Sequence, residues 1–274
     1  MSIRAFLLCA LAGCLVPILV SAQRSETDYP KSGLDLAKAG QMDAALAALN
    51  KAIEINPHYE YAYLNRGKLW FHRGDTNRGF ADLDKAIEIK PDFAEAYFTR
   101  AANNEMCFNT NSALADYNWA VQLNPTNIDY RLMLASLEEE NGDFVSAIAD
   151  NEKITKLKPD DTKIYSIYIA IGRLKHKRRD WDGSLLAFDT ATKLKPDCSS
   201  AYFGRGLVKC LKNDLPGAME DFNKAIELKP DYSEAFLSRS ALRKKMGDLE
   251  GAFEDSDKAL EIKRSELRKQ LHLK

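Results

Sequence analysis

Arginine and aspartate recur 16 positions apart along the sequence, and four of these pairs are considered first. A guanidinium group and a carboxylate can form a charge-assisted ion pair with two parallel hydrogen bonds. Arginine also recognises anionic ligands, so a row of arginines that binds anions is the alternative. We interpret the pairs as partly buried bridges between two helices of one structural unit. The pairs are Arg66–Asp82, Arg100–Asp116, Arg205–Asp221 and Arg239–Asp255.

The sequence contains none of the common catalytic or metal-binding motifs. There is no P-loop, GxSxG, HExxH or CxxC pattern, and the histidines lack the spacing of metal ligands. Because no catalytic constellation is present, we predict that the protein is not an enzyme and that it uses no cofactor or metal. The histidines are His58, His72, His176 and His272.

The composition is typical of a folded protein and gives no sign of a nucleic-acid partner. Of the 274 residues, 45% are hydrophobic and 29% are charged, with 39 Lys and Arg against 40 Asp and Glu. The basic run at residues 173–179 carries no interleaved aromatic residues for base stacking. We interpret it as a solvated helix end, with partner binding as the second possibility and nucleic acid as the weakest.

The elements that position the arginines are indicated by a repeat. Residues 86–97 (AIEIKPDFAEAY) and 225–236 (AIELKPDYSEAF) are near copies, and prolines recur at an almost constant interval. When each repeat unit is numbered from position 1, with the first unit beginning at residue 26, most units have an aromatic residue at position 4. Most also have small residues at positions 8, 20 and 27. The prolines are Pro57, Pro91, Pro125, Pro159, Pro196 and Pro230, so one interval is three positions longer than the others.

This pattern resembles the tetratricopeptide repeat family. The resemblance implies an all-α fold, a right-handed α-solenoid of stacked helix–turn–helix units, over residues 26–266. Seven repeats then begin at residues 26, 60, 94, 128, 165, 199 and 233. The arginines lie at position 7, where the family usually has leucine, and their aspartates lie at position 23.

The resemblance also implies a concave groove, lined by positions 2, 5, 9, 12 and 13 of each first helix. We predict that a protein or peptide partner binds there, with packing between repeats as the alternative role of position 5. The candidate partner-binding residues are Leu64, Phe71, Phe98, Leu132, Ile169, Arg173, His176, Phe203 and Leu237.

Charge is unevenly distributed along the predicted groove. Its middle is expected to be acidic and its later part basic. The acidic residues are Glu95, Glu105, Asp129, Glu139 and Glu140, and the basic ones are Arg173, His176, Lys177, Lys244 and Lys245.

The fourth repeat departs from the pattern. It has Arg131 at position 4, Leu134 at position 7 and Asp150 at position 23, and three extra residues follow it near 162–164. Because each unit of a solenoid contacts only its neighbours, an atypical repeat beside an insertion weakens one interface. We predict a local change of path or a hinge at residues 158–165.

Three cysteines lie beyond position 22: Cys107, Cys198 and Cys210. On the predicted helix the last two are separated by roughly 16 Å, which exceeds the limit of about 7 Å between the Cα atoms of a disulfide. We expect free thiols that act as small apolar packing residues.

The two ends of the chain have different predicted roles. Residues 1–22 resemble a cleaved secretory signal, with an apolar stretch before Val20-Ser21-Ala22. The alternatives are a lipoprotein modified at Cys14, within LAGC, and an uncleaved anchor. At the other end, the last helix is expected to continue into a capping extension, 267–274, in which Leu267, Leu271 and Leu273 cover the final repeat.

Together these observations predict an exported scaffold or adaptor for protein–protein interaction, periplasmic or secreted. The alternative is an assembly factor of an envelope complex, tethered to the membrane through a lipidated or uncleaved N-terminus. We expect no contact with nucleic acid and, without such a tether, no contact with the membrane.

Overall fold

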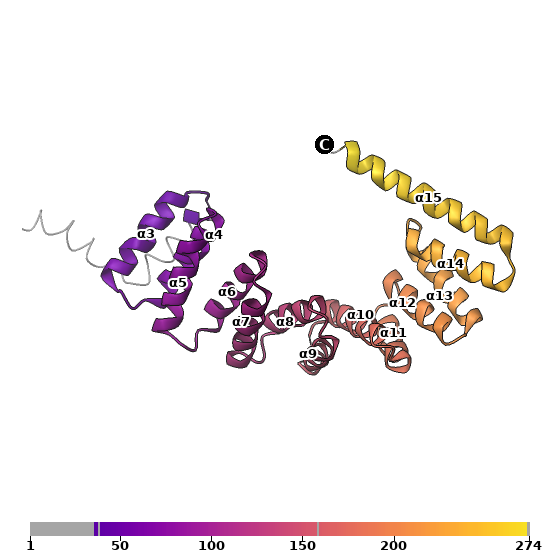
Figure 1. Ribbon diagram of the computed structural model, residues 1–274, viewed down its shortest axis with the longest axis horizontal. Coiled ribbons are helices and arrows are strands. Elements are labelled where there is room, and N and C mark those ends of the chain that lie inside the picture. The colour runs from indigo at the N-terminus through magenta and orange to yellow at the C-terminus, as the bar shows by residue number, and fades with distance from the viewer. Residues whose placement is uncertain (1–35, 38, 158, 273–274) are drawn as a thin grey trace, which may run out of the picture. The chain divides into compact units, whose positions relative to one another are not determined.

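The structure is a computed structural model that describes residues 36–37, 39–157 and 159–272. The predicted signal peptide, with Cys14, and the capping residue Leu273 lie outside the described residues. The described residues form α-helices joined by short turns, with no β-strand among them (Figure 1). The fold class is therefore all-α, as predicted. None of the described helices has the length and apolar character needed to cross a membrane.

The helices follow one another as antiparallel hairpins, and all are of similar length except for two longer ones, α10 and α15. The helices are α3 (Met42–Ile55), α4 (Glu60–His72), α5 (Thr76–Ile89), α6 (Ala94–Met106), α7 (Thr110–Leu123), α8 (Ile128–Glu140), α9 (Phe144–Lys156), α10 (Asp161–Lys177), α11 (Trp181–Leu194), α12 (Ser199–Leu211), α13 (Leu215–Leu228), α14 (Ser233–Met246) and α15 (Leu249–His272).

From the hairpin of α4 and α5 onwards, the turn inside each hairpin is set by a left-handed residue followed by an aspartate or asparagine. Gly74, with φ of 81°, precedes Asp75, whose carboxylate accepts a hydrogen bond from the backbone N–H of Arg78 and caps α5. Phe108 occupies the equivalent place with φ of 60°, a conformation that costs about 1 kcal/mol in a residue other than glycine. The turn geometry thus recurs even where glycine does not.

Small residues let the two helices of a hairpin approach each other. A Cβ atom added to Gly67 in α4 would lie 3.1 Å from the carbonyl oxygen of Gly79 in α5. Both positions belong to the small-residue columns of the repeat. Larger side chains there would separate the helices and weaken their packing.

The chain divides into two compact units at Pro125–Thr126. The first unit contains α3 to α7, and one of its buried clusters joins Leu64, Leu83 and Phe93. The second unit contains α8 to α15, and one of its buried clusters joins Phe222 to Leu242.

The three extra residues near 162–164 lengthen a helix. Helix α10 has 17 residues and begins at Asp161, where Asp160 caps it by accepting from the N–H of Lys163. Ile154 of α9 is buried in one cluster with Ile167 and Ile171 of α10. The junction at 158–165 therefore lies inside the second unit, and a hinge there stays a prediction.

Helix α15 is continuous from Leu249 to His272, which agrees with the expected extension of the last helix. Leu267 and Leu271 do not pack on the final repeat, however, because they are 57% and 65% exposed, and a capping extension at 267–274 stays a prediction. The reason is length: α15 has 24 residues and its hairpin partner α14 only 14. The final turns of α15 extend past α14, which leaves both leucines exposed.

The three cysteines are free thiols, as expected. Cys198 is buried against Ala191 and Ala201, which fits the role of a small apolar packing residue. Cys107, by contrast, is exposed at the end of α6.

Candidate partner-binding site

The arginines at position 7 form the bridges that the sequence predicts. In each of the four repeats, Nε and Nη2 of the arginine donate to the two carboxylate oxygens of its aspartate. The distances are 2.8 and 2.6 Å for Arg66–Asp82, 2.8 and 2.7 Å for Arg100–Asp116, 3.0 and 2.6 Å for Arg205–Asp221, and 2.9 and 2.6 Å for Arg239–Asp255. We call this arrangement the arginine clasp.

Each clasp also reaches the preceding repeat, which sequence reasoning missed. The remaining nitrogen, Nη1, donates to an asparagine or aspartate that lies 16 positions before the arginine in the sequence. One side chain therefore joins three helices of two consecutive repeats. The signal was available in the sequence, because all four arginines have such a residue at that spacing. The acceptors are Asn50 at 2.7 Å, Asp84 at 2.6 Å, Asp189 at 2.8 Å and Asn223 at 2.7 Å.

The aromatic residue at position 4 completes the clasp. The guanidinium carbon of Arg100 lies 5.5 Å from the ring centroid of Tyr97, and that of Arg205 lies 5.3 Å from that of Tyr202. Hydrogen bonds to the aspartates raise the pKa of both guanidinium groups. Because aspartate carboxylates and aromatic rings already contact these guanidinium groups, we interpret the clasp as structural and not as an anion-binding site.

The fourth repeat uses a different arginine. Arg131, at position 4, is buried, and its Nη1 donates to Oδ1 of Asp150 at 2.7 Å. Lys153 donates to the same oxygen at 2.9 Å. The guanidinium thus comes from one helical turn earlier, which explains why this repeat keeps Asp150 while carrying Leu134 at position 7.

A buried acid distinguishes the fourth repeat further. Glu138 is buried, and its Oε2 has no hydrogen-bond partner among the described residues. Burial, with Asp150 and Asp143 nearby, raises the pKa of Glu138 to about 7. The corresponding residue is Lys209 in the sixth repeat, and it forms an ion pair with Asp221 at 2.8 Å.

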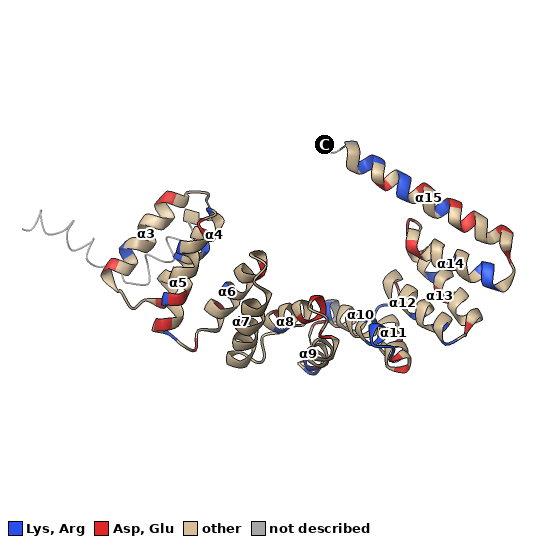
Figure 2. Cartoon of the chain, in the orientation of Figure 1, with Lys and Arg blue, Asp and Glu red and all other residues tan. Residues whose placement is uncertain are grey.

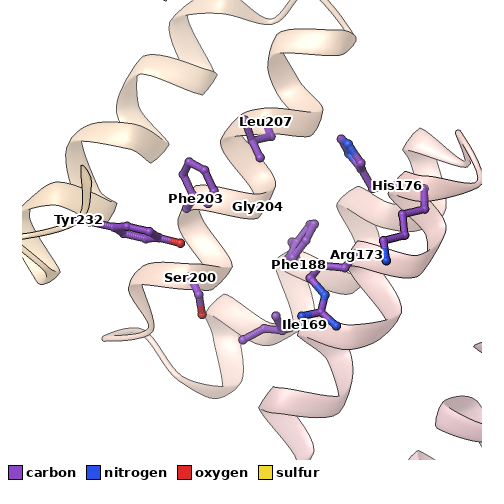
Figure 3. A pocket seen from close by; sticks show the side chains of 10 residues that line it. Ile169, Arg173, His176, Phe188, Ser200, Phe203, Gly204, Leu207 and Tyr232 are labelled. Atoms are coloured by element: carbon purple, nitrogen blue, oxygen red, sulfur yellow. The ribbon is translucent and has the colours of Figure 1, made fainter. Parts of the chain in front are cut away.

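An apolar hollow of about 410 Å³ lies between α10 and α12 in the second unit. Helices α10 and α12 provide most of its lining, and all of these residues except Gly204 lie at positions that the resemblance assigns to the groove (Figure 3). From α10 come Ile169, Arg173, His176 and Lys177, from α12 Ser200, Phe203, Gly204 and Leu207, and from neighbouring elements Phe188 and Tyr232.

The floor of the hollow depends on two glycines. The ring of Phe188 is buried, and a Cβ atom on Gly172 would lie 2.9 Å from it. A Cβ atom on Gly204 would also overlap this ring. Glycine at both positions lets Phe188 of α11 reach between α10 and α12. Phe203 forms the opposite wall, with its ring centroid 4.9 Å from that of Tyr232.

The rim of the hollow is basic but partly neutralised. Arg173 and Lys177 donate to the carboxylate of Glu139 at 3.0 and 2.8 Å. The ring centroid of His176 lies 5.3 Å from that of Trp181, and burial lowers the pKa of this histidine. His176 therefore stays neutral at pH 7 and contributes a flat aromatic edge.

Other predicted groove residues lie in packed surroundings. Leu64 is 1% exposed, so a partner cannot reach it in this structure. The ring centroid of Phe71 lies 5.0 Å from that of Phe80, and Phe98 lies 5.5 Å from Tyr117 by the same measure.

In the second unit the remaining two candidates differ from each other. Leu132 is half-buried against the cluster of Ile154, Ile167 and Ile171. Leu237 is 39% exposed and is open to a partner. Ile169, Arg173, His176 and Phe203 are the predicted residues that the structure brings together in the hollow.

Much of the charge predicted for the groove is paired within the protein. Lys68 forms an ion pair with Glu95 at 2.7 Å, and Lys163 forms one with Asp129 at 3.2 Å. These pairs join consecutive repeats. They partly neutralise the acidic side chains that the sequence predicts for the groove.

Helical hairpins that recur at a constant period, with small residues at the crossing of each hairpin, define the tetratricopeptide repeat class. Two stretches of the sequence match models of this repeat: residues 33–74 match one described as TPR repeat, and residues 169–233 match one described as tetratricopeptide repeat. These two stretches are therefore tetratricopeptide repeats, which typically serve as non-catalytic scaffolds for protein–protein interaction.

Solved structures with low sequence identity share the fold. The C-terminal part of a TPR repeat-containing protein from Cytophaga hutchinsonii superposes with a TM-score of 0.67 at 15% identity, over 85% of this chain and 98% of that one. MamA gives 0.56 at 22% identity, over 61% and 96%. YrrB, described as a TPR protein with an unusual peptide-binding site, gives 0.53 at 21%, over 66% and 91%. No curated protein sequence matches the chain.

Proposed function

We propose that the protein is an interaction scaffold that holds a peptide segment of its partner in the hollow between α10 and α12. The observation that carries this proposal is the position of the hollow. Its lining comes from groove positions of two consecutive repeats, and it offers Phe203 and Leu207 as apolar walls. A concave apolar surface with a few polar groups at its rim is typical of a peptide-anchor site.

The residues that line the hollow favour one kind of peptide side chain as the anchor, the side chain that enters the hollow. Ile169, Phe188 and Phe203 favour a large apolar or aromatic side chain, because burying it removes apolar area from water. The cations at the rim favour an acidic neighbour on the peptide. Since Glu139 already engages Arg173 and Lys177, an acidic peptide must displace that carboxylate, and its charge adds less affinity than its apolar anchor.

Export also stays part of the proposal. It rests on the apolar stretch and the small residues within positions 1–22 of the sequence. The alternative of a membrane-tethered assembly factor rests on Cys14 in the same stretch.

The proposal is tested with short fluorescent peptides that differ at one central anchor, Phe or Ser, and at two flanking positions, Glu or Gln. We expect the Phe peptides to bind and the Ser peptides to bind about 30-fold more weakly, the equivalent of about 2 kcal/mol of apolar burial. The Leu207→Glu variant should bind the Phe and Ser peptides with similar affinity, because it places a charge in the apolar wall. Fluorescence anisotropy provides the measurement.

The matched control is Leu186→Glu, which adds the same charge at an exposed position of α11 outside this hollow. It should bind the Phe peptides as the parent does. If the Phe and Ser peptides bind equally to the parent, or if Leu207→Glu and Leu186→Glu behave alike, the hollow is not the anchor site.

A further inference from the structure

Helix α15 carries an exposed apolar stripe that the fold leaves uncovered. Its members are 49% to 72% exposed. At 3.6 residues per turn they fall within about 40° of one another around the helix axis. We call this set the α15 stripe: Leu249, Phe253, Leu260, Leu267 and Leu271.

The positions equivalent to the first three stripe residues form a packing surface in the preceding repeat. The residues one repeat earlier, Leu215, Met219 and Ile226 of α13, are partly buried against the next hairpin. In α15 the same positions have no following hairpin among the described residues. A repeat whose apolar outer face no hairpin covers needs a cover or a partner to remain soluble.

The spacing of the stripe is symmetric about Leu260. Phe253 and Leu267 each lie seven positions from it, and Leu249 and Leu271 each lie eleven positions from it. Two antiparallel copies of α15 would therefore place Leu260 against Leu260, Phe253 against Leu267, and Leu249 against Leu271. The stripe extends over about 33 Å, so a repeat helix of ordinary length could cover only part of it.

The charges beside the stripe are also complementary in an antiparallel pair. Acidic residues lie towards the beginning of α15 and basic residues towards its end (Figure 2). On one flank of the stripe, Glu250 and Asp257 lie before Leu260, and Arg264 and Arg268 lie after it. In the antiparallel register Asp257 faces Arg264 of the other copy, and Glu250 approaches Arg268 of the other copy. In a parallel pair this flank would face the opposite flank of the other copy, so these acidic and basic residues would not pair with one another.

We propose that α15 is a self-association surface, through which two copies of this chain pair as an antiparallel, two-fold symmetric dimer. The pairing is isologous, so each copy contributes the same stripe and the interface closes on itself. It joins two partner-binding grooves in one assembly, which increases avidity for a partner with two binding segments.

Sedimentation equilibrium of the full chain tests the pairing. The parent should be a dimer, and Phe253→Glu with Leu260→Glu should be a monomer, because both charges would be buried in the interface. Val145→Glu with Leu186→Glu, two exposed apolar positions on α9 and α11, is the matched control and should remain a dimer. A monomeric parent, or a dimer that survives the α15 changes, would overturn the proposal.

Charge reversal tests the register. Asp257→Arg alone and Arg264→Asp alone should each raise the dimer dissociation constant about tenfold, because each places like charges opposite one another. The combined variant should return to the parent value. If the combined variant is as weak as the single ones, these two residues do not face each other and the antiparallel register is wrong.

Cysteine cross-linking separates antiparallel from parallel pairing. In a Cys107→Ser background, which removes an exposed thiol, Leu260→Cys should form a disulfide-linked dimer. Phe253→Cys should cross-link only when mixed with Leu267→Cys. Cross-linking of Phe253→Cys with itself would show a parallel pair, and cross-linking in the unmodified background would show contact elsewhere. Either result overturns the proposed interface.

Discussion

The second and fourth repeats pair a buried aspartate with a cation in different ways. Both keep an aspartate at position 23 of the repeat. In the second repeat Arg66 reaches Asp82 from position 7 with two hydrogen bonds, and its third nitrogen holds Asn50 of the preceding repeat. In the fourth repeat Arg131 reaches Asp150 from position 4 through its Nη1, and Lys153 supplies a second cation.

The difference shows what the clasp contributes. The guanidinium at position 7 lies where it can join its own hairpin to the preceding one. The guanidinium at position 4 is more deeply buried and replaces the aromatic ring. The fourth repeat also buries Glu138 near Asp150, so its polar interior carries an extra acid. We infer that the clasp repeats are built for stability, whereas the fourth repeat is sensitive to pH.

The largest expected effect comes from breaking a clasp at its acid. Asp82→Leu should destabilise the protein by about 3 kcal/mol, because it leaves the guanidinium of Arg66 partly buried without its carboxylate. Arg66→Leu with Asp82→Leu should be milder than Asp82→Leu alone, since the pair is removed together. Urea unfolding followed by circular dichroism measures both. A double variant at least as unstable as the single one would contradict the clasp.

A smaller effect, of opposite sign, is expected at Glu138. Its pKa in the folded protein, about 7, is higher than the ordinary value, so the folded state binds the proton more tightly than the unfolded state. This contribution to stability is present at low pH and is lost as the pH rises through 7. Glu138→Gln should therefore stabilise the protein at pH 8 by about 2 kcal/mol more than at pH 5.

The control for this prediction is Glu140→Gln on the same helix, where the side chain is exposed. Urea unfolding of this variant should follow the parent at both pH values. An equal gain from Glu138→Gln at pH 5 and pH 8 would show that the buried carboxylate does not titrate in this range.

The smallest effect is expected where the clasp reaches the preceding repeat. Asp189 accepts from Nη1 of Arg205 at 2.8 Å but is 44% exposed, so Asp189→Ala should cost about 0.5–1 kcal/mol. Hydrogen exchange should show the loss in α11 and α12, the helices that this bond joins. Glu220→Ala, an exposed acid on α13, is the comparison and should change neither helix.

The sequence by itself determined the all-α fold, the period and the pairing of Arg66 with Asp82. These features depend on residue type at a fixed spacing, and a constant period repeats the same local geometry in each copy. It also indicated four residues of the hollow, Ile169, Arg173, His176 and Phe203, because the groove positions are a property of the repeat.

Only the tertiary structure decided which side chains remain accessible. Leu64 and Phe203 occupy the same position of their repeats, yet Leu64 is buried and Phe203 lines the hollow. Accessibility depends on what neighbouring helices place against a residue, here Phe188 between two glycines. The same reason explains Leu267 and Leu271: their spacing fits a cap, but α14 is too short to meet them, so they remain exposed.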